Sequence, residues 1–317
     1  MYRVGALGDK MMASSLLTLN DISPKELHQI FKRAKAFKAK IKKHKKINTL
    51  QGRVVGLFFE KPSTRTRVSF ETAVTRLGGK AVYLASKDLQ HSRGESIKDI
   101  AQTLGSYLDA LIARVYAHKT VEELARYAKV PVINGLSDLT HPTQIICDLF
   151  TILEIKKKLK GLALAYIGDG NNICCSLFMG AAMTGMDMTA ACPGGYYPNE
   201  GIFKTAQQIA KKTGAKLRIV EDPKNAAKDA DILYTDVWVS MGQEKQKEER
   251  LKAFKGYQVN AAILKLAKKG ASVMHCLPAY KGLEIAEDVI EGPQSIIWQQ
   301  TENKVYGAAG ILDFMLR

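Results

Sequence analysis

The sequence alternates between short apolar runs and longer amphipathic segments along almost its whole length. Residues 54–59 form a short apolar run with β-branched and aromatic side chains, which is typical of a buried strand. Apolar residues then recur at three- and four-residue intervals from Val68 to Leu77, as on one face of a helix. Repeated alternation of this kind favours an α/β fold in which helices cover both faces of a parallel sheet.

The alternation runs in two series, joined by a long helical pattern from His141 to about Leu159. We therefore predict two doubly wound parallel-sheet domains joined by long helices, one spanning residues 1–148 and the other 149–300. A last helix, about 301–317, is expected to pack back onto the first domain. The other expected strands are 81–84, 110–115, 131–133, 162–167, 188–191, 216–220, 232–237 and 272–275. The other expected helices are 23–46, 97–107, 121–128, 176–183 and 200–212.

Composition places the chain among globular proteins. It has 317 residues, of which 46% are apolar and 25% charged, and this length is enough for two domains. No apolar run approaches a membrane span, and the first fifteen residues lack the apolar core of a secretory signal. The five cysteines are odd in number and form no C-x-x-C pair, which favours free thiols in a reducing compartment. We therefore expect a cytoplasmic protein without membrane contact.

The chain is strongly basic, with a formal net charge of +16. Nine of the fifteen residues in 32–46 are Lys or Arg, a density compatible with nucleic-acid or anionic-membrane binding. Phe37 is the one aromatic residue in that run, so the interleaved rings that stack on bases are absent. The interpretation we favour is a solvated helix face whose field attracts small anions, without a nucleic-acid partner.

Residues 61–70 connect the first strand to the helix that follows it. Pro62 ends the strand because it cannot donate to the sheet ladder, and Ser63 and Thr64 are predicted to cap the helix. A helix start offers unpaired N–H groups and a positive dipole end, and here two arginines add charge. The turn is therefore suited to a phosphate group, although it lacks the glycines of a Walker loop. The alternative is a capped surface helix with solvated arginines.

Four other strand ends also have polar side chains, and ligands of doubly wound sheets bind at the carboxyl ends of strands. Taken singly these are weak signals, since a His before Pro is commonly a structural cap and a lone Cys commonly belongs to the core. Together they predict a ligand site. They are Arg114, the HPTQ sequence at 141–144, the DVWVSMG sequence at 236–242 and the HCLP sequence at 275–278.

In order and spacing these motifs resemble the transcarbamylases, which transfer a carbamoyl group from carbamoyl phosphate to an amine. The resemblance spans about residues 16–316 and includes the STRTR sequence at 63–67. The DVWVSMG and HCLP motifs, and the GDGNN sequence at 168–172, are similar to those of the ornithine-specific branch. The resemblance implies transfer to the side-chain amine of L-ornithine, giving L-citrulline and phosphate in arginine metabolism, with no metal and no organic cofactor.

The resemblance also implies a role for each site residue. Arg114 and His141, with Thr66 beside them, would stabilise negative charge on the carbonyl oxygen, where one such donor contributes ~3 kcal/mol. The implied carbamoyl phosphate residues are Ser63, Thr64, Arg65, Thr66, Gln90, Arg114, His141, Gln144, Cys276, Leu277 and Lys304. The implied ornithine residues are Asn172, Asp236, Ser240 and Met241, and the implied catalytic residues are Arg114, His141, Asp236 and Cys276.

Four of these implied roles are more specific. Gln144 would hold the carbamoyl NH₂ through its amide oxygen. Cys276 would position the amine without a covalent intermediate, because the amine attacks directly. Gln90 matches a position that family members present to a neighbouring subunit, which implies a homotrimer or a multiple of trimers. Lys304 stands where the family usually has arginine, so the charge is kept, the planar fork is lost, and weaker carbamoyl phosphate binding is expected.

Three alternatives remain at this point. A transcarbamylase for another amine, such as putrescine, would have a disrupted Ser-Met-Gly loop, whereas residues 240–242 are intact. A nicotinamide dehydrogenase is suggested by Gly168 and Gly170 after a strand, but Ile173 stands where the third glycine belongs. A basic nucleic-acid-binding protein would use the run 32–46.

Overall fold

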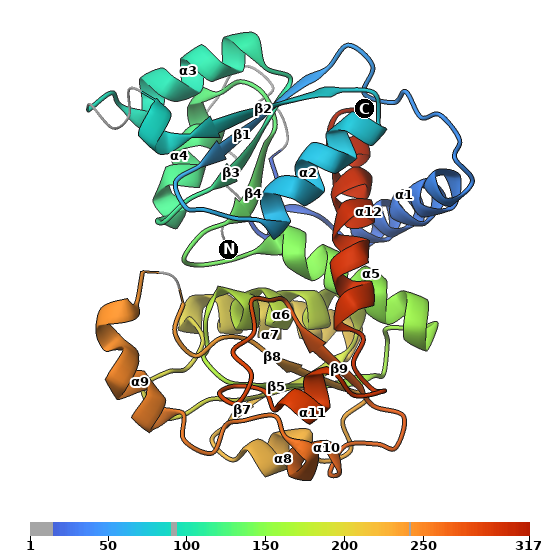
Figure 1. The fold of residues 1–317 in the computed structure, drawn as a ribbon, viewed down its shortest axis with the longest axis vertical. Coiled ribbons are helices and arrows are strands. Elements are labelled where there is room, and N and C mark those ends of the chain that lie inside the picture. The colour runs from blue at the N-terminus through green and yellow to red at the C-terminus, as the bar shows by residue number, and fades with distance from the viewer. Residues whose placement is uncertain (1–14, 90–93, 241) are drawn as a thin grey trace.

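Two parallel sheets, each flanked by helices, form the computed structural model, which describes residues 15–89, 94–240 and 242–317 (Figure 1). The strand orders are β2-β1-β3-β4 and β7-β6-β5-β8-β9, and all neighbouring strands run parallel. The predicted α/β class with two parallel sheets is therefore confirmed. The strands are β1 (Val54–Phe59), β2 (Lys80–Ala85), β3 (Ala110–Arg114), β4 (Val132–Leu136), β5 (Ala163–Ile167), β6 (Asp187–Ala191), β7 (Leu217–Val220), β8 (Ile232–Thr235) and β9 (Ser272–His275).

Helices cover both faces of each sheet. Among the residues that the structure describes, no helix is long and apolar enough to cross a membrane. The helices are α1 (Pro24–Lys42), α2 (Arg65–Arg76), α3 (Ile97–Tyr107), α4 (His118–Tyr127), α5 (Pro142–Lys156), α6 (Asn172–Thr184), α7 (Glu200–Thr213), α8 (Pro223–Ala227), α9 (Lys247–Ala253), α10 (Ala261–Leu264), α11 (Glu287–Ile290) and α12 (Ile297–Met315).

The central strands β1 and β3 of the first sheet are buried on both faces, which explains why β1 is apolar throughout. Leu57 and Ile112 belong to the same apolar cluster as residues of α1 and α2. Phe58 and Leu111 belong instead to the cluster that includes residues of α3 and α4. Since side chains alternate between the faces of a strand, one continuous apolar run serves both helix layers.

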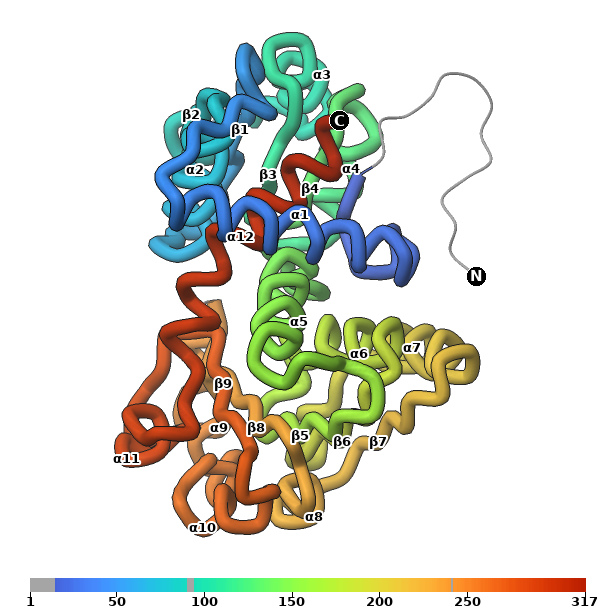
Figure 2. Tube along the Cα trace, turned by 90° about the vertical axis from the view of Figure 1, so that its right-hand side faces the viewer, coloured from blue at the N-terminus to red at the C-terminus, as the bar shows by residue number. Residues whose placement is uncertain are grey.

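Two long helices connect the halves of the molecule (Figure 2). α5 follows the first sheet and leads to β5, and its first eleven residues, 142–152, are all buried. α12 begins beside β9 in the second half and packs along α5, α1 and α2 in the first half. After its start beside β9, α12 therefore packs mainly on α1, α2 and α5. The domain boundaries given above remain a prediction.

Several elements differ from the sequence prediction at their ends. β8 ends at Thr235 rather than Val237, so Asp236 lies in the following loop. α5 ends at Lys156 because Lys157 adopts a left-handed backbone with φ of 63°. Four helices of four to seven residues, α8 to α11, were not predicted, because such short segments show no helical period.

Much of the basic run 32–46 lies on α1 and has structural partners. Lys38 Nζ donates to Glu154 Oε2 and to Asn303 Oδ1, both at 2.7 Å, and these acceptors belong to α5 and α12. Arg33 pairs with Asp313 of α12. These two cations therefore attach α1 to its neighbours, which argues against a binding surface formed by the whole run.

Candidate active site

A cavity of about 530 Å³ lies between strand ends of the two sheets. Residues that end or follow β1, β3 and β4 line one wall, and residues that follow β8 and β9 line the other. Two predicted site residues, Gln90 and Met241, lie outside the described residues. All the others line the cavity: Ser63, Thr64, Arg65, Thr66, Arg114, His141, Gln144, Asn172, Asp236, Ser240, Cys276, Leu277 and Lys304.

The start of α2 forms one end of the cavity. Ser63 Oγ accepts a hydrogen bond from Thr66 N at 3.2 Å and so caps the helix. The predicted cap at Thr64 is wrong, because its backbone is already helical and its side chain makes no capping hydrogen bond. Of the two arginines, Arg65 lines the cavity, whereas Arg67 pairs with Glu71 at 3.0 Å. One guanidinium and several hydroxyl and N–H groups thus surround this helix start, an arrangement suited to an anion.

Arg114 and Lys61 add positive charge beside the helix start. Burial, followed by the charge of Arg65, lowers the pKa of Arg114 to about 10. Arg114 Nε is buried and has no hydrogen-bond partner among the described residues, so this cation retains donor capacity. Lys61 Nζ lies 4.5 Å from the ring centroid of Tyr116, and burial, followed by the charge of Arg114, lowers its pKa. Lys61 was not predicted as a site residue, although it directly precedes Pro62.

His141 is a neutral imidazole at the start of α5. Its backbone N donates to Ser176 Oγ at 2.8 Å, which ties α5 to α6. Burial lowers the pKa of His141 well below its ordinary value, and the charges of Lys304 and Arg114 lower it further. A neutral ring keeps one N–H and can donate a hydrogen bond without requiring a counter-ion.

Lys304 reaches the cavity from α12. Its Nζ donates to Gln144 Oε1, and both side chains are buried. Burial lowers the pKa of Lys304 to about 8. The C-terminal helix therefore places a cation with an unusually low pKa beside Gln144 and His141.

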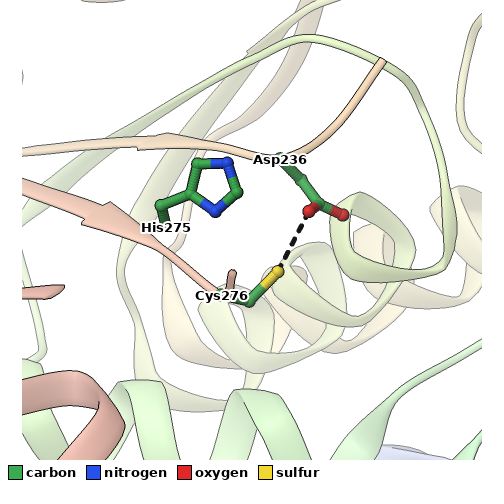
Figure 3. Close-up of side chains that lie close together, drawn as sticks. All are labelled: Asp236, His275 and Cys276. Carbon is green, nitrogen blue, oxygen red and sulfur yellow. Dashed lines mark hydrogen bonds between the residues drawn. The ribbon is translucent and has the colours of Figure 1, made fainter. Parts of the chain in front are cut away.

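The opposite wall bears the carboxylates Asp236, Glu244 and Glu284, together with one cation, Lys247. Asp236 Oδ2 accepts from Asn171 Nδ2 at 2.8 Å, and Oδ1 accepts from Cys276 Sγ at 3.1 Å (Figure 3). Burial raises the pKa of the Cys276 thiol well above its ordinary value, so it is protonated at neutral pH. Asn172 lines the cavity and donates to Ser137 O at 2.6 Å, whereas Asn171, which was not predicted, positions Asp236. The sequence signal that could have identified Asn171 is its place beside Asn172 in the GDGNN motif.

Asp236, His275 and Cys276 also lie close enough together to resemble a metal site, since their ligand atoms are within 4.8 Å of one another (Figure 3). Both ring nitrogens of His275 are already used, however. Nδ1 accepts from Leu277 N at 2.8 Å, and Nε2 lies 3.1 Å from Glu284 Oε1. The imidazole thus holds the loop after β9 in place and offers no free nitrogen for a metal.

A buried ion pair anchors the loop that follows β8. Arg250 Nη1 donates to Asp169 Oδ2 and to Trp238 O, both at 2.9 Å. Arg250 Nε also donates to Gln246 Oε1 at 3.2 Å. The loop containing Ser240 is therefore attached at its base to the turn after β5. Arg250 gave no signal in the sequence, because its ion-pair partner Asp169 lies 81 positions away along the chain.

Comparison with known proteins matches each half of the chain to a known protein domain. Residues 14–154 match the carbamoyl-P binding domain of aspartate/ornithine carbamoyltransferase, and residues 160–315 match its Asp/Orn binding domain. The chain belongs to the aspartate/ornithine carbamoyltransferase family. An ornithine carbamoyltransferase of Pyrococcus horikoshii is 48% identical over 301 residues, which cover 95% of this chain and 95% of that protein.

Solved structures of carbamoyltransferases share the fold of this family member. The ornithine carbamoyltransferase of Pyrococcus furiosus is 48% identical, with a TM-score of 0.92 and coverage of 95% of this chain and 96% of that one. The anabolic enzyme of Campylobacter jejuni is 41% identical, with a TM-score of 0.89 and coverage of 95% and 98%. The two-sheet architecture around the cavity is therefore that of solved ornithine carbamoyltransferases.

The glycine-rich turn at residues 168–172 of this carbamoyltransferase leaves no room for a dinucleotide. A Cβ on Gly170 would stand 2.2 Å from Pro198 N, so this glycine permits packing against the chain's own backbone. The start of α6 is capped internally, since Asn171 Oδ1 accepts from Ile173 N and Cys174 N at 3.0 and 3.2 Å. The dehydrogenase alternative therefore has no support from this turn.

Proposed function

We propose that this protein transfers the carbamoyl group of carbamoyl phosphate to the side-chain amine of L-ornithine, producing L-citrulline and phosphate. The observation that supports this most is the division of charge in the cavity. Arg65, Arg114 and Lys304 lie on the wall built from α2, β3 and α12, and Asp236 lies on the opposite wall. A dianionic donor and a cationic amino acid need such opposite surroundings.

The phosphate of the donor binds at the start of α2. Backbone N–H groups at a helix start, the Arg65 guanidinium and the hydroxyls of Ser63, Thr64 and Thr66 supply donors from several directions. Thr64 contributes because its side chain makes no capping bond.

Attack on the carbonyl carbon places negative charge on the carbonyl oxygen. Arg114 and His141 stabilise this charge, one as a cation and the other as a neutral donor. Removal of one such donor from comparable sites costs ~3 kcal/mol of transition-state stabilisation. The two groups are held by β3 and α5, so little reorganisation accompanies the reaction.

The amine approaches from the side of Asp236 and Cys276. The neutral nitrogen forms a bond to the carbonyl carbon, the carbon–oxygen bond to phosphate breaks, and one nitrogen proton leaves with the phosphate. Asp236 attracts the amino acid, with Asn172, Ser240 and Met241 holding its α-amino and carboxylate groups. Cys276 positions the amine as a thiol, which agrees with the raised pKa of its sulfur. No covalent enzyme intermediate is needed.

We also propose a homotrimer, or a multiple of trimers, in which Gln90 completes the site of a neighbouring subunit. Val68 and Val82 are 51% and 41% exposed on α2 and β2, beside the sheet edge from which the chain continues to Gln90. Exposed apolar side chains at this edge support the proposal that a neighbouring subunit covers it. A cytoplasmic location and a domain boundary near residue 148 complete the proposal, and the five free cysteines fit a reducing compartment.

Citrulline formation and phosphate release test the proposal. Purified protein is supplied with carbamoyl phosphate and, in parallel, with ornithine, putrescine or aspartate. Citrulline and phosphate released in equal amounts with ornithine are expected. Faster phosphate release with putrescine or aspartate, or none with any amine, contradicts the proposed substrate. Light scattering checks the trimer, and a monomer with full activity contradicts the shared site.

A further inference from the structure

A buried carboxylate lies behind the cavity wall, one helical turn along α5 from Gln144. This residue, Asp148, is completely buried and does not line the cavity, and the reaction above gives it no step. Burying a carboxylate is costly unless several donors compensate the loss of water. Its partners therefore indicate what the buried charge does.

Asp148 accepts hydrogen bonds from three side chains on three different elements. Oδ1 accepts from Gln144 Nε2 of α5 at 2.9 Å and from Gln300 Nε2 of α12 at 2.8 Å. Oδ2 accepts from Tyr234 OH of β8 at 2.7 Å. Burial raises the pKa of Asp148 to about 6, so the carboxylate form still predominates at neutral pH.

An ionised carboxylate can only accept hydrogen bonds, so both neighbouring amides must turn their NH₂ groups toward it. Each amide oxygen then points the other way. Gln144 Oε1 accepts from Lys304 Nζ at the cavity, and Gln300 Oε1 accepts from His275 N at 3.1 Å. In this orientation the NH₂ group and the oxygen of each amide both have a hydrogen-bond partner.

We propose that Asp148 is a positioning residue, whose carboxylate holds the Gln144 amide with its oxygen facing the carbamoyl group. This inference rests on the proposed function. The carbamoyl NH₂ is a donor, so it needs an oxygen opposite it, and a reversed amide would present a second NH₂. The Gln144 oxygen has two lone pairs and can accept from Lys304 and the carbamoyl group together. Asp148 and Lys304 thus hold opposite ends of the Gln144 amide, and Asp148 keeps its NH₂ away from the substrate.

Replacement of Asp148 by asparagine tests this orientation. The side chain keeps its shape, but one carboxylate oxygen becomes an NH₂ group. If this NH₂ faces the glutamines, it opposes their NH₂ groups. If it faces Tyr234, the hydroxyl proton of Tyr234 lacks an acceptor. Asp148→Asn is expected to raise the Kd for carbamoyl phosphate by about tenfold or more, the effect of one lost hydrogen bond. The Kd for inorganic phosphate, which lacks a carbamoyl group, should change less than about threefold. Calorimetry measures both.

Asp313→Asn is the matched control. Asp313 is also a buried carboxylate, but it pairs with Arg33 on α1 and does not line the cavity. This change should leave both Kd values unaltered. Asp148→Ser, which removes the carboxylate and leaves room for a water, is the second variant if the asparagine variant does not fold. Equal losses of carbamoyl phosphate and phosphate affinity in a folded variant would indicate a general structural role and overturn the inference.

A double variant shows whether Asp148 acts through Gln144. In a Gln144→Leu background, Asp148→Asn should add less than about threefold to the Kd for carbamoyl phosphate. An undiminished tenfold effect in that background overturns the inference. Absence of citrulline formation by the unaltered protein overturns the proposed function instead. Unaltered protein that binds carbamoyl phosphate no more tightly than phosphate overturns both.

Discussion

We predict that Lys304 makes carbamoyl phosphate binding depend on pH, whereas an arginine in its place would not. Its ammonium is buried, donates to Gln144 Oε1, and has a pKa lowered to about 8. The ammonium form therefore predominates below pH 8 and the neutral amine above it. The Kd for carbamoyl phosphate should be nearly constant up to about pH 7 and rise as the pH increases through 8.

The expected size of the effect follows from one charge-assisted hydrogen bond. Such a bond contributes ~1.5–3 kcal/mol, so Lys304→Ala should raise the Kd by about ten- to hundredfold at pH 7. At about pH 9.5 the Kd of the unaltered protein should approach that of the alanine variant. Lys304→Arg should bind more tightly and keep its affinity across this range, because a guanidinium stays charged and forms a bidentate fork.

Calorimetric titration with carbamoyl phosphate alone is the suitable assay, because the ornithine amine also titrates and would obscure a rate measurement. Ornithine affinity is the control and should differ little among the three proteins. An unaltered Kd in Lys304→Ala, or a flat profile to pH 9.5 in the unaltered protein, would refute a contact between Lys304 and the donor.

Three other substitutions separate the roles of the cavity walls. Arg65→Ala should raise the KM for carbamoyl phosphate by at least about tenfold, because a guanidinium leaves the helix start; an unchanged KM in steady-state kinetics would contradict this. Asp236→Asn should weaken ornithine binding about tenfold or more while sparing carbamoyl phosphate, and separate titrations reporting equal losses would indicate a structural role. Cys276→Ser should retain measurable turnover with a raised KM for ornithine, whereas mass spectrometry that traps a carbamoylated Cys276 would disprove the positioning role.

The fold, and the gathering of the predicted site residues around one cavity, followed from the sequence because both depend on local patterns. The apolar run of β1 and the strand ends at Arg114 and His275 were visible as short segments with polar neighbours. Partners distant along the chain were not visible. The bond between Asp148 and Gln300 joins residues 152 positions apart, and Asp148 looks like any polar residue of a helix. Thr64 was assigned as a cap because Ser63 and Thr64 have similar propensities, and only the backbone geometry distinguishes them.

The packing of α12 against α1 has a consequence for synthesis on the ribosome. Gly310 lies so close to α1 that an added Cβ would stand 2.7 Å from Ile30 O, so α1 and α12 fit tightly. The apolar face of α1, including Phe31 and Ala34, is therefore without this cover until the end of the chain has been translated. A nascent chain released before residue 297 presents that face to chaperones and proteases.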